Sequence, residues 1–272
     1  MRPALSSTQL RMIRARAALF VSDVDGTLTD GGYTVAPSTS RLIAGLEAVM
    51  RVAVLTGRSF ASAAAIARSI SPTCIIGSCN GGYVVDPASG AEIHRARYEV
   101  ADLERVDALA RDTGVGVAYY TPEAVYTPYP FVLHELFEEA EGITSVRDHP
   151  ADLGHVVKFT VALDPGREDE QAGELTRECP ALVRSVSWIL ELTSKEASKE
   201  AALDALCRYL DVAPERAIGA GDGENDIAWM RAVGYRVVPE DAHRAVAAMA
   251  DVVVDACSRE GVARFANALA RA

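Results

Sequence analysis

The sequence contains no long run of apolar residues. No stretch among its 272 residues is long enough to cross a bilayer as a helix. Its first residues, Met1-Arg2-Pro3-Ala4, lack the apolar core of a signal peptide. The sequence therefore predicts a cytoplasmic protein that has no membrane as a partner.

Basic residues are outnumbered by acidic ones. The chain has 27 Lys and Arg against 38 Asp and Glu, which gives a formal net charge of −11. Nucleic acids attract basic surfaces, so we expect no nucleic acid among the partners. The five cysteines are odd in number and form no Cys-x-x-Cys pair, which indicates neither a disulfide framework nor a zinc site.

Strand-like and helix-like segments alternate in the first and last parts of the chain. An amphipathic stretch at 38–50 and a stretch of small residues at 59–70 predict helices that separate short apolar runs. The expected strands are 18–22, 52–55, 74–77, 235–238 and 252–254. This alternation predicts an α/β fold with a doubly wound, Rossmann-like parallel sheet.

Two carboxylates follow the first expected strand. Asp23 and Asp25 stand directly before Gly26, at the end of a strand where open α/β sheets place their ligands. Burying two like charges costs free energy unless a cation compensates, so we expect a hard metal ion nearby. The alternative is an ordinary surface turn, because Asp before Gly is common in turns. A second acidic turn at 221–226 also follows an apolar segment, which favours a shared site.

Four motifs occur in a fixed order along the chain. They are Asp23-Val24-Asp25-Gly26-Thr27, Leu55-Thr56-Gly57-Arg58, Ala197-Ser198-Lys199 and Gly221-Asp222-Gly223-Glu224-Asn225-Asp226. In this order they resemble the motifs of the haloacid dehalogenase superfamily, and within it those of the Cof-type sugar-phosphate phosphatases. The sequence at 31–33, beside the first motif, predicts a short hairpin or flap.

The resemblance implies a phosphatase that forms a covalent aspartyl-phosphate. Asp23 would be the nucleophile, which divides one difficult displacement into two easier ones. Asp25 would be the general acid and base of the two half-reactions. Thr56 and Gly57 would bind the phosphate, and Lys199 would bind it and neutralise charge on the transferring group.

The resemblance also implies a Mg²⁺ cofactor, which prefers oxygen ligands. Asp222 and the Asp23 carboxylate would hold the ion together with the main-chain carbonyl of Asp25. Asp226 would act through metal-bound water, and Asn225 would donate a hydrogen bond to the phosphate.

Lys195 remains an alternative to Lys199. Residues 193–196 have the pattern of a capping box, which would begin a helix there and leave Lys199 on a solvated face. An apolar face continues after Lys199 and favours that residue; it consists of Leu203, Leu206 and Leu210.

The sequence changes character between residues 86 and 187. Turn residues cluster there between short strand-like runs such as 156–161. This region resembles the family's α+β cap, inserted into a core made of residues 1–85 and 188–272. Its polar and aromatic residues are candidates for recognising the leaving group, with tyrosines stacking on a sugar: Tyr119, Tyr120, Tyr126, Tyr129, His134, His155, Lys158 and Arg184.

Three functions are therefore considered. The first is a Mg²⁺-dependent phosphatase of a small phosphorylated metabolite, a sugar or polyol phosphate by resemblance. The second is a phosphomutase or phosphotransferase, in which the aspartyl-phosphate passes to another hydroxyl. The third is a non-catalytic binding protein on the same scaffold, which ranks last because every expected catalytic side chain is present.

Overall fold

An eight-stranded sheet forms the larger part of the fold. The structure is a computed structural model that describes residues 5–30, 32 and 34–272, so most of the flap expected at 31–33 lies outside the described residues. The strand order is β13-β12-β11-β1-β2-β3-β4-β5. The strands are β1 (Leu19–Ser22), β2 (Arg51–Leu55), β3 (Ile75–Ser78), β4 (Tyr83–Asp86), β5 (Ala91–Arg95), β11 (Ala217–Ala220), β12 (Tyr235–Pro239) and β13 (Val252–Val254).

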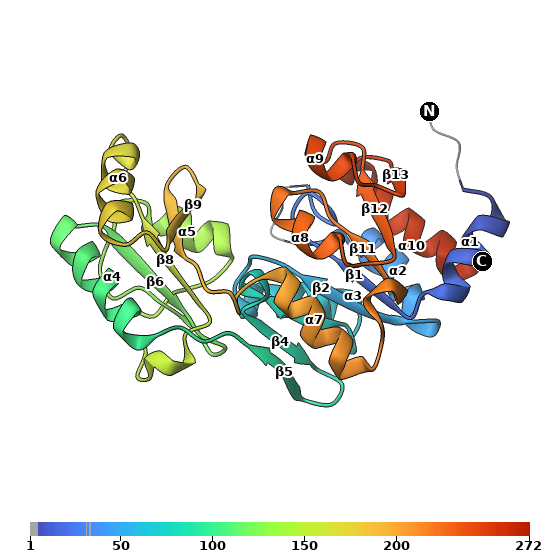
Figure 1. The fold of residues 1–272 in the computed structure, drawn as a ribbon, viewed down its shortest axis with the longest axis horizontal. Helices are drawn as coiled ribbons and strands as arrows, with labels where there is room; N and C mark the ends of the chain where they lie inside the picture. Colours follow the sequence, from blue (N-terminus) through green and yellow to red (C-terminus); the bar gives the residue numbers. More distant parts are fainter. Residues whose placement is uncertain (1–4, 31, 33) are drawn as a thin grey trace.

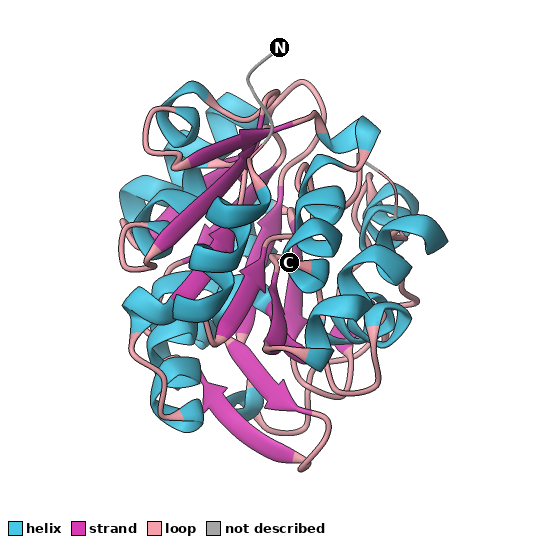
Figure 2. Ribbon diagram, turned by 90° about the vertical axis from the view of Figure 1, so that its right-hand side faces the viewer, coloured by secondary structure: helices cyan, strands magenta, loops and turns pink. Residues whose placement is uncertain are grey.

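Helices cover both faces of this sheet (Figure 1, Figure 2). One face packs against α1 (Ser7–Arg16), α2 (Pro37–Ala44), α3 (Phe60–Ile70) and α10 (Gly261–Arg271). The other face packs against α7 (Lys199–Leu210), α8 (Ile227–Met230) and α9 (Arg244–Ala247). Because neighbouring residues of β1 point to opposite faces, Phe20 enters the first core and Leu19 and Val21 enter the second. The expected doubly wound α/β fold is confirmed.

A second, five-stranded sheet forms the cap, at the left of Figure 1. Its order is β7-β6-β8-β10-β9 and all its pairings are antiparallel. The strands are β6 (Gly116–Tyr120), β7 (Val125–Tyr126), β8 (Lys158–Ala162), β9 (Leu182–Val186) and β10 (Ile189–Leu192). The cap helices are α4 (Val100–Thr113), α5 (His134–Glu141) and α6 (Glu168–Glu178). Helices α4 and α6 pack on the sheet through one apolar core.

The two sheets divide the chain at points that differ from the boundaries expected at 86 and 188. Strands β4 and β5 form a hairpin that extends the core sheet through antiparallel pairing with β3, so the core continues to Arg95. Strand β10 pairs with β8 and β9, so Trp188 and residues 189–192 belong with the cap. The return to the core comes only at the segment that leads into α7.

Short 3₁₀ helices connect several of these elements. They are Gly45–Ala48, Cys79–Gly81, Leu153–His155, Pro214–Arg216, Glu224–Asp226 and Cys257–Arg259. All five cysteines are buried and none is in a disulfide. Within the described parts of the chain, no helix has both the length and the apolar character needed to span a membrane.

Gly81 brings the β3–β4 connection against the start of α7. Its φ is +90°, and a Cβ at this position would lie 2.3 Å from the Ser198 main-chain oxygen and 2.8 Å from the Ala202 Cβ. A side chain here would both strain the backbone and push α7 away from the sheet. The position of Lys199, the first residue of α7, therefore depends on this glycine.

We expect Gly81→Ala to lower the free energy of unfolding by at least about 3 kcal/mol, because it combines backbone strain with overpacking. Gly90→Ala is the matched control, since Gly90 also has a positive φ of +72° but no atom within 4 Å of a built Cβ. The control should cost only about 1 kcal/mol. Urea unfolding followed by circular dichroism would measure both; equal losses would contradict the proposed contact with α7.

Candidate active site

Three parallel strands of the core sheet end side by side. In the register of the sheet, Ser22 is opposite Ala220 on one side and Val54 on the other. The segments that follow β1, β11 and β2 therefore begin at the same edge. These segments carry Asp23, Asp222 and Thr56, which is how residues 199 positions apart come together.

Lys199 joins the nucleophile candidate to the second acidic turn. Its Nζ lies 2.6 Å from Asp23 Oδ1 and 2.7 Å from Asp226 Oδ1, and all three residues are buried. Although burial lowers it, the charges of Asp23 and Asp226 raise the pKa of Lys199 overall. The side chain therefore stays a buried ammonium. Lys195, by contrast, is exposed, and α7 begins at Lys199 with Ser198 as its N-cap.

Asp226 is saturated with hydrogen bonds. Its Oδ1 accepts from Lys199 and from Trp229 Nε1 at 2.9 Å, and its Oδ2 accepts from the main-chain N–H groups of Asp222 and Gly223 at 3.1 and 3.0 Å. With four donors on two oxygens, this carboxylate holds Lys199 and shapes the acidic turn. It has little capacity left to ligate an ion directly, which fits the indirect role expected for it.

The oxygens of Asp23, Asp222 and Asp226 are close enough to surround a cation. One oxygen of each lies within 4.8 Å of the others. A Cβ at Gly26, which has a φ of +79°, would lie only 2.2 Å from Asp222 Oδ2, so the first loop encloses this carboxylate without a side chain between them. An all-oxygen donor set suits a hard divalent ion such as Mg²⁺.

The charges of this cluster also favour a cation. Three carboxylates face one ammonium. Burial raises the pKa of Asp23 to about 8, with Lys199 opposing the shift and Asp226 reinforcing it. Burial also raises the pKa of Asp222. A divalent cation would supply the missing positive charge, so the residues present fit the metal that the sequence implies.

Asp25 points away from this buried cluster, and its side chain is 51% exposed. The guanidinium of Arg58 binds both of its oxygens, with Nε at 3.2 and 3.0 Å, and also donates to the Gly32 main-chain oxygen at 2.8 Å. This bidentate pair fixes the orientation of the candidate acid and base. Arg58 was not singled out from the sequence, although it stands within the second motif.

The other predicted phosphate-binding residues surround the same space. Thr56 is fully buried and its Oγ1 accepts from the Arg58 N–H at 3.3 Å. Gly57 lies against Asn80, whose Oδ1 would be 2.9 Å from a Cβ at residue 57. Asn225 is exposed beside the acidic turn. The structure thus brings all eight predicted site residues to one edge of the sheet.

Two adjoining pockets lie between this edge and the cap. The Asp25 pocket, of about 500 Å³, is lined by Asp25, Arg58 and Asn80 from the core and by Glu141, Lys158 and Glu191 from the cap, among others. The Asp222 pocket, of about 600 Å³, adjoins it. Its lining includes Asp222 and His243 from the core and the β9 residues Val183 and Arg184.

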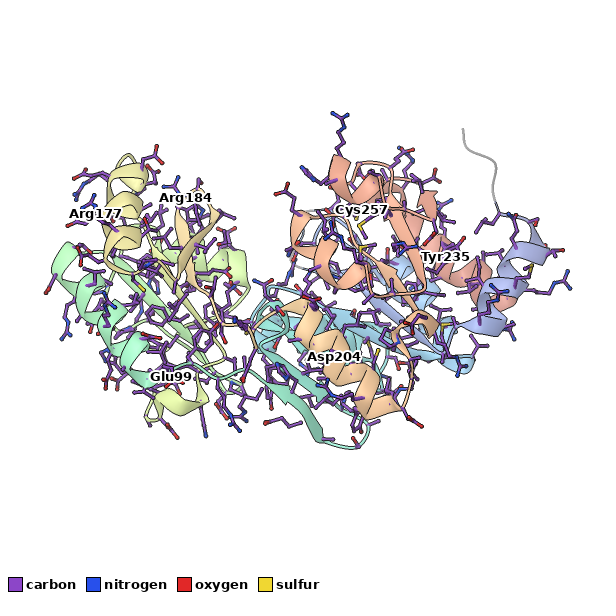
Figure 3. The ribbon with its side chains drawn as sticks, in the orientation of Figure 1. Glu99, Arg177, Arg184, Asp204, Tyr235 and Cys257 are labelled. Atoms are coloured by element: carbon purple, nitrogen blue, oxygen red, sulfur yellow. The ribbon has the colours of Figure 1, made fainter. Side chains whose placement is uncertain are left out.

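Among the cap candidates, Lys158 and Arg184 line these pockets and the other six do not. Arg184 binds Asp169 of α6 at 2.7 Å and the Glu168 main-chain oxygen at 2.9 Å, at the top of the cap in the view of Figure 3. Lys158 instead reaches the core, where its Nζ donates to the Gly57 main-chain oxygen at 3.0 Å.

The expectation that tyrosines stack on a sugar is wrong for Tyr119 and Tyr120. Both are about 1% exposed: Tyr119 belongs to the apolar core of the cap, and Tyr120 belongs to a cluster in which cap residues pack against Cys79 and Tyr83 of the core. Their hydroxyls bind Asp107 and Glu141, respectively. Alternation along β6 places one ring on each face of the cap sheet, with Tyr119 in the core formed with the cap helices and Tyr120 in the cluster shared with the core domain.

Two further supporting residues escaped the sequence analysis. Thr27 donates from Oγ1 to Asp222 Oδ1 at 2.7 Å, which ties the first motif to the fourth. Trp229 donates to Asp226 from α8. Thr27 lies inside a quoted motif, whereas Trp229 reads as an ordinary core residue and gives no separate signal in the sequence.

Comparisons with known proteins identify the class. Residues 20–265 match the family of haloacid dehalogenase-like hydrolases. The chain therefore belongs to this family, and the resemblance to the superfamily and to its Cof-type group is confirmed.

Individual relatives agree with this assignment. A phosphoglycolate phosphatase of Methanothermobacter thermautotrophicus is 25% identical over 89% of this chain and 93% of its own. A haloacid dehalogenase-like hydrolase from Bacteroides thetaiotaomicron has a TM-score of 0.81 at 22% identity, covering 92% of this chain and 98% of its own. The subclass IIB sugar phosphatase BT4131 has a TM-score of 0.73 at 19% identity, covering 91% and 97%. At such identities the two solved structures support the fold.

Lys199→Met should destabilise the protein by about 3–5 kcal/mol at pH 8, because it leaves buried carboxylates without their cation. In the folded state the pKa of Asp23 is raised from 3.8 to about 8. Protonation of Asp23 therefore favours the folded state at low pH, and this contribution is lost as the pH rises toward about 8. The loss of unfolding free energy in Lys199→Met should accordingly be smaller at pH 5. Urea unfolding at both pH values would measure it.

Lys195→Met serves as the matched control, since Lys195 is exposed. It should change stability by no more than about 0.5 kcal/mol at either pH. A comparable loss in both variants would contradict the distinct role given to Lys199.

Proposed function

We propose that this hydrolase is a Mg²⁺-dependent phosphatase that releases phosphate from a small phosphorylated metabolite, a sugar or polyol phosphate, through an aspartyl-phosphate on Asp23. The observation that carries the proposal is the buried contact of Asp23 with Lys199 beside the carboxylates of Asp222 and Asp226. A carboxylate held in this way is oriented by an ammonium that can also neutralise an incoming phosphoryl group.

In the first half-reaction, an Asp23 oxygen forms a bond to phosphorus and the bond from phosphorus to the leaving-group oxygen breaks. The leaving oxygen takes a proton from Asp25, which borders the pocket next to the nucleophile. Lys199 stays close to the charge that builds up on the phosphoryl oxygens. Asp25 must turn from Arg58 to reach the leaving group, and its exposure leaves room for that rotation.

In the second half-reaction, Asp25 takes a proton from a water molecule as the water oxygen attacks phosphorus. The bond between phosphorus and Asp23 breaks, which releases inorganic phosphate and restores the carboxylate. Thr56, Gly57 and Asn225 would hold the phosphoryl oxygens during both steps. The lining of the pockets by both core and cap supports a reaction sheltered from bulk water.

Asp23, Asp222 and the main-chain carbonyl of Asp25 would hold the Mg²⁺, with Asp226 acting through water. When bound, the ion supplies positive charge that stabilises the phosphoryl oxygens in the transition state. Thr27 orients Asp222 for this purpose through its hydroxyl hydrogen bond.

The fold family and its phosphatase relatives support this choice of reaction, and the sugar phosphatase among the solved structures supports the substrate class. The net charge of −11 argues against a nucleic-acid partner. A cytoplasmic location stays a prediction.

Purified protein with Mg²⁺ should release inorganic phosphate from p-nitrophenyl phosphate and from hexose or polyol phosphates. Asp23→Asn should lower kcat at least about 10³-fold, because an amide cannot act as the nucleophile. Asp112→Asn, at an exposed position of α4, should retain wild-type activity. Full activity in Asp23→Asn would refute the mechanism, and phosphate appearing on a second hydroxyl would favour the phosphotransferase alternative.

Mg²⁺ should stabilise the folded protein by about 2.7 kcal/mol at a concentration 100 times its Kd. This would be measured as a rise in Tm by differential scanning calorimetry, without substrate. Asp222→Asn should lose most of the rise because it removes a charged ligand, while Asp112→Asn should keep it. A Tm that does not respond to Mg²⁺ in the wild-type protein would exclude the proposed metal site.

A further inference from the structure

The Asp25 pocket carries paired charges with an excess of carboxylates. Its charged lining residues, among those the structure describes, are three acids, Asp25, Glu141 and Glu191, and two cations, Arg58 and Lys158. The leaving group of the proposed reaction must occupy this space, because Asp25 donates its proton there. The charges of the pocket therefore bear on the chemistry of the leaving group.

The cation from the cap is fully engaged by the protein. Lys158 Nζ donates to the Gly57 main-chain oxygen at 3.0 Å, pairs with Glu191 Oε1 at 3.3 Å and lies 4.9 Å from the centre of the Tyr120 ring. Its side chain is only 10% exposed. The charges of Glu191 and Glu141 raise its pKa despite burial, so it stays an ammonium that these acids neutralise.

The core cation is also engaged. Arg58 binds both oxygens of Asp25 and the Gly32 main-chain oxygen. When Asp25 turns toward a leaving group, it brings a carboxyl group into the pocket and leaves Arg58 at the rim of the nucleophile's loop. With Asp25 turned inward, Arg58 keeps the Gly32 main-chain oxygen as a partner, while Lys158 stays paired with Glu191 inside the pocket.

The two cap carboxylates differ in which pockets they line. Glu141 accepts from the Tyr120 hydroxyl at 2.9 Å and from the Ser59 N–H at 3.1 Å, which uses both of its oxygens. Glu191 likewise uses both oxygens, one with Asn80 Nδ2 at 3.1 Å and the other with Lys158, and its side chain is 22% exposed. It lines both the Asp25 pocket and the Asp222 pocket. Glu191 is therefore the acid that a leaving group would meet.

A half-buried carboxylate accepts hydrogen bonds from hydroxyl groups and repels another carboxylate. The neighbouring lining from β9, Ser185 and Val186, adds no positive charge. We propose that Glu191 is a specificity-determining residue, which accepts a hydrogen bond from a hydroxyl of the leaving group and disfavours a carboxylate there. This inference rests on the proposed phosphatase function.

The proposal distinguishes this chain from its relative in Methanothermobacter thermautotrophicus, which is named for phosphoglycolate. Phosphoglycolate carries a carboxylate one carbon away from the phosphate ester. A pocket that rejects a carboxylate would cleave this compound poorly, even though the catalytic residues suit any phosphate monoester.

The test compares substrates that differ only in this group. The first pair is 2-hydroxyethyl phosphate against 2-phosphoglycolate, and the second is glucitol 6-phosphate against 6-phosphogluconate. In whichever pair the wild-type enzyme with Mg²⁺ cleaves better, kcat/KM should be at least about tenfold higher for the hydroxyl compound than for the carboxylate compound. Equal or better cleavage of the carboxylate members would overturn the inference while leaving the phosphatase function standing. If no phosphate monoester is cleaved, including p-nitrophenyl phosphate, both proposals fail.

Glu191→Gln then assigns the effect to one side chain. It should reduce the ratio of kcat/KM for the hydroxyl compound to kcat/KM for the carboxylate compound by about fivefold or more. The reason is that it removes the repelling charge and leaves Lys158 with one acid fewer. Glu104→Gln, at an exposed position of α4, makes the same change in net charge and should leave the ratio unaltered. A ratio that is unchanged in Glu191→Gln, measured in protein with a wild-type circular dichroism spectrum, would overturn the assignment to Glu191.

Discussion

The contact between Lys199 and two buried aspartates is the interaction on which the rest of the site depends. A buried ammonium needs strong acceptors, and Asp23 and Asp226 supply them at 2.6 and 2.7 Å. The same carboxylates, together with Asp222, exceed the charge that one lysine can neutralise. An arrangement selected for stability alone would balance its charges or replace them with apolar residues. The remaining negative charge would favour a cation in this cluster.

The fold makes this unfavourable arrangement possible by assembling it from rigid elements. Asp23 and Asp222 follow adjacent parallel strands in register, and Lys199 begins a twelve-residue helix that packs on the same sheet. Gly81 allows that helix to approach closely. Because the elements that carry Asp23, Asp222 and Lys199 pack into the shared apolar cores of one sheet, these elements cannot move apart without disturbing that packing.

Much of the core was predictable because its signals are local. Buried parallel strands read as short apolar runs, and acidic turns after them identify Asp23 and Asp222 without knowledge of the fold. Lys199 was harder to assign, since only the position of α7 in space separates it from Lys195. The β4–β5 hairpin and β10 were misplaced because a strand's sequence does not state which sheet it joins. Tyr119 and Tyr120 were misread because a tyrosine on a twisted antiparallel sheet suits a core as well as a ligand surface.

The cap reaches the reaction centre through the loop that follows β2. Lys158 donates to the main-chain oxygen of Gly57, and Glu141 accepts from the N–H of Ser59, so two cap side chains flank Arg58 on this loop. Arg58 in turn orients Asp25. A displacement of the cap must therefore break these contacts or move the loop that holds the candidate acid and base. The position of the cap and the orientation of Asp25 are thereby joined in one chain of contacts, which would link the binding of a leaving group to the candidate acid.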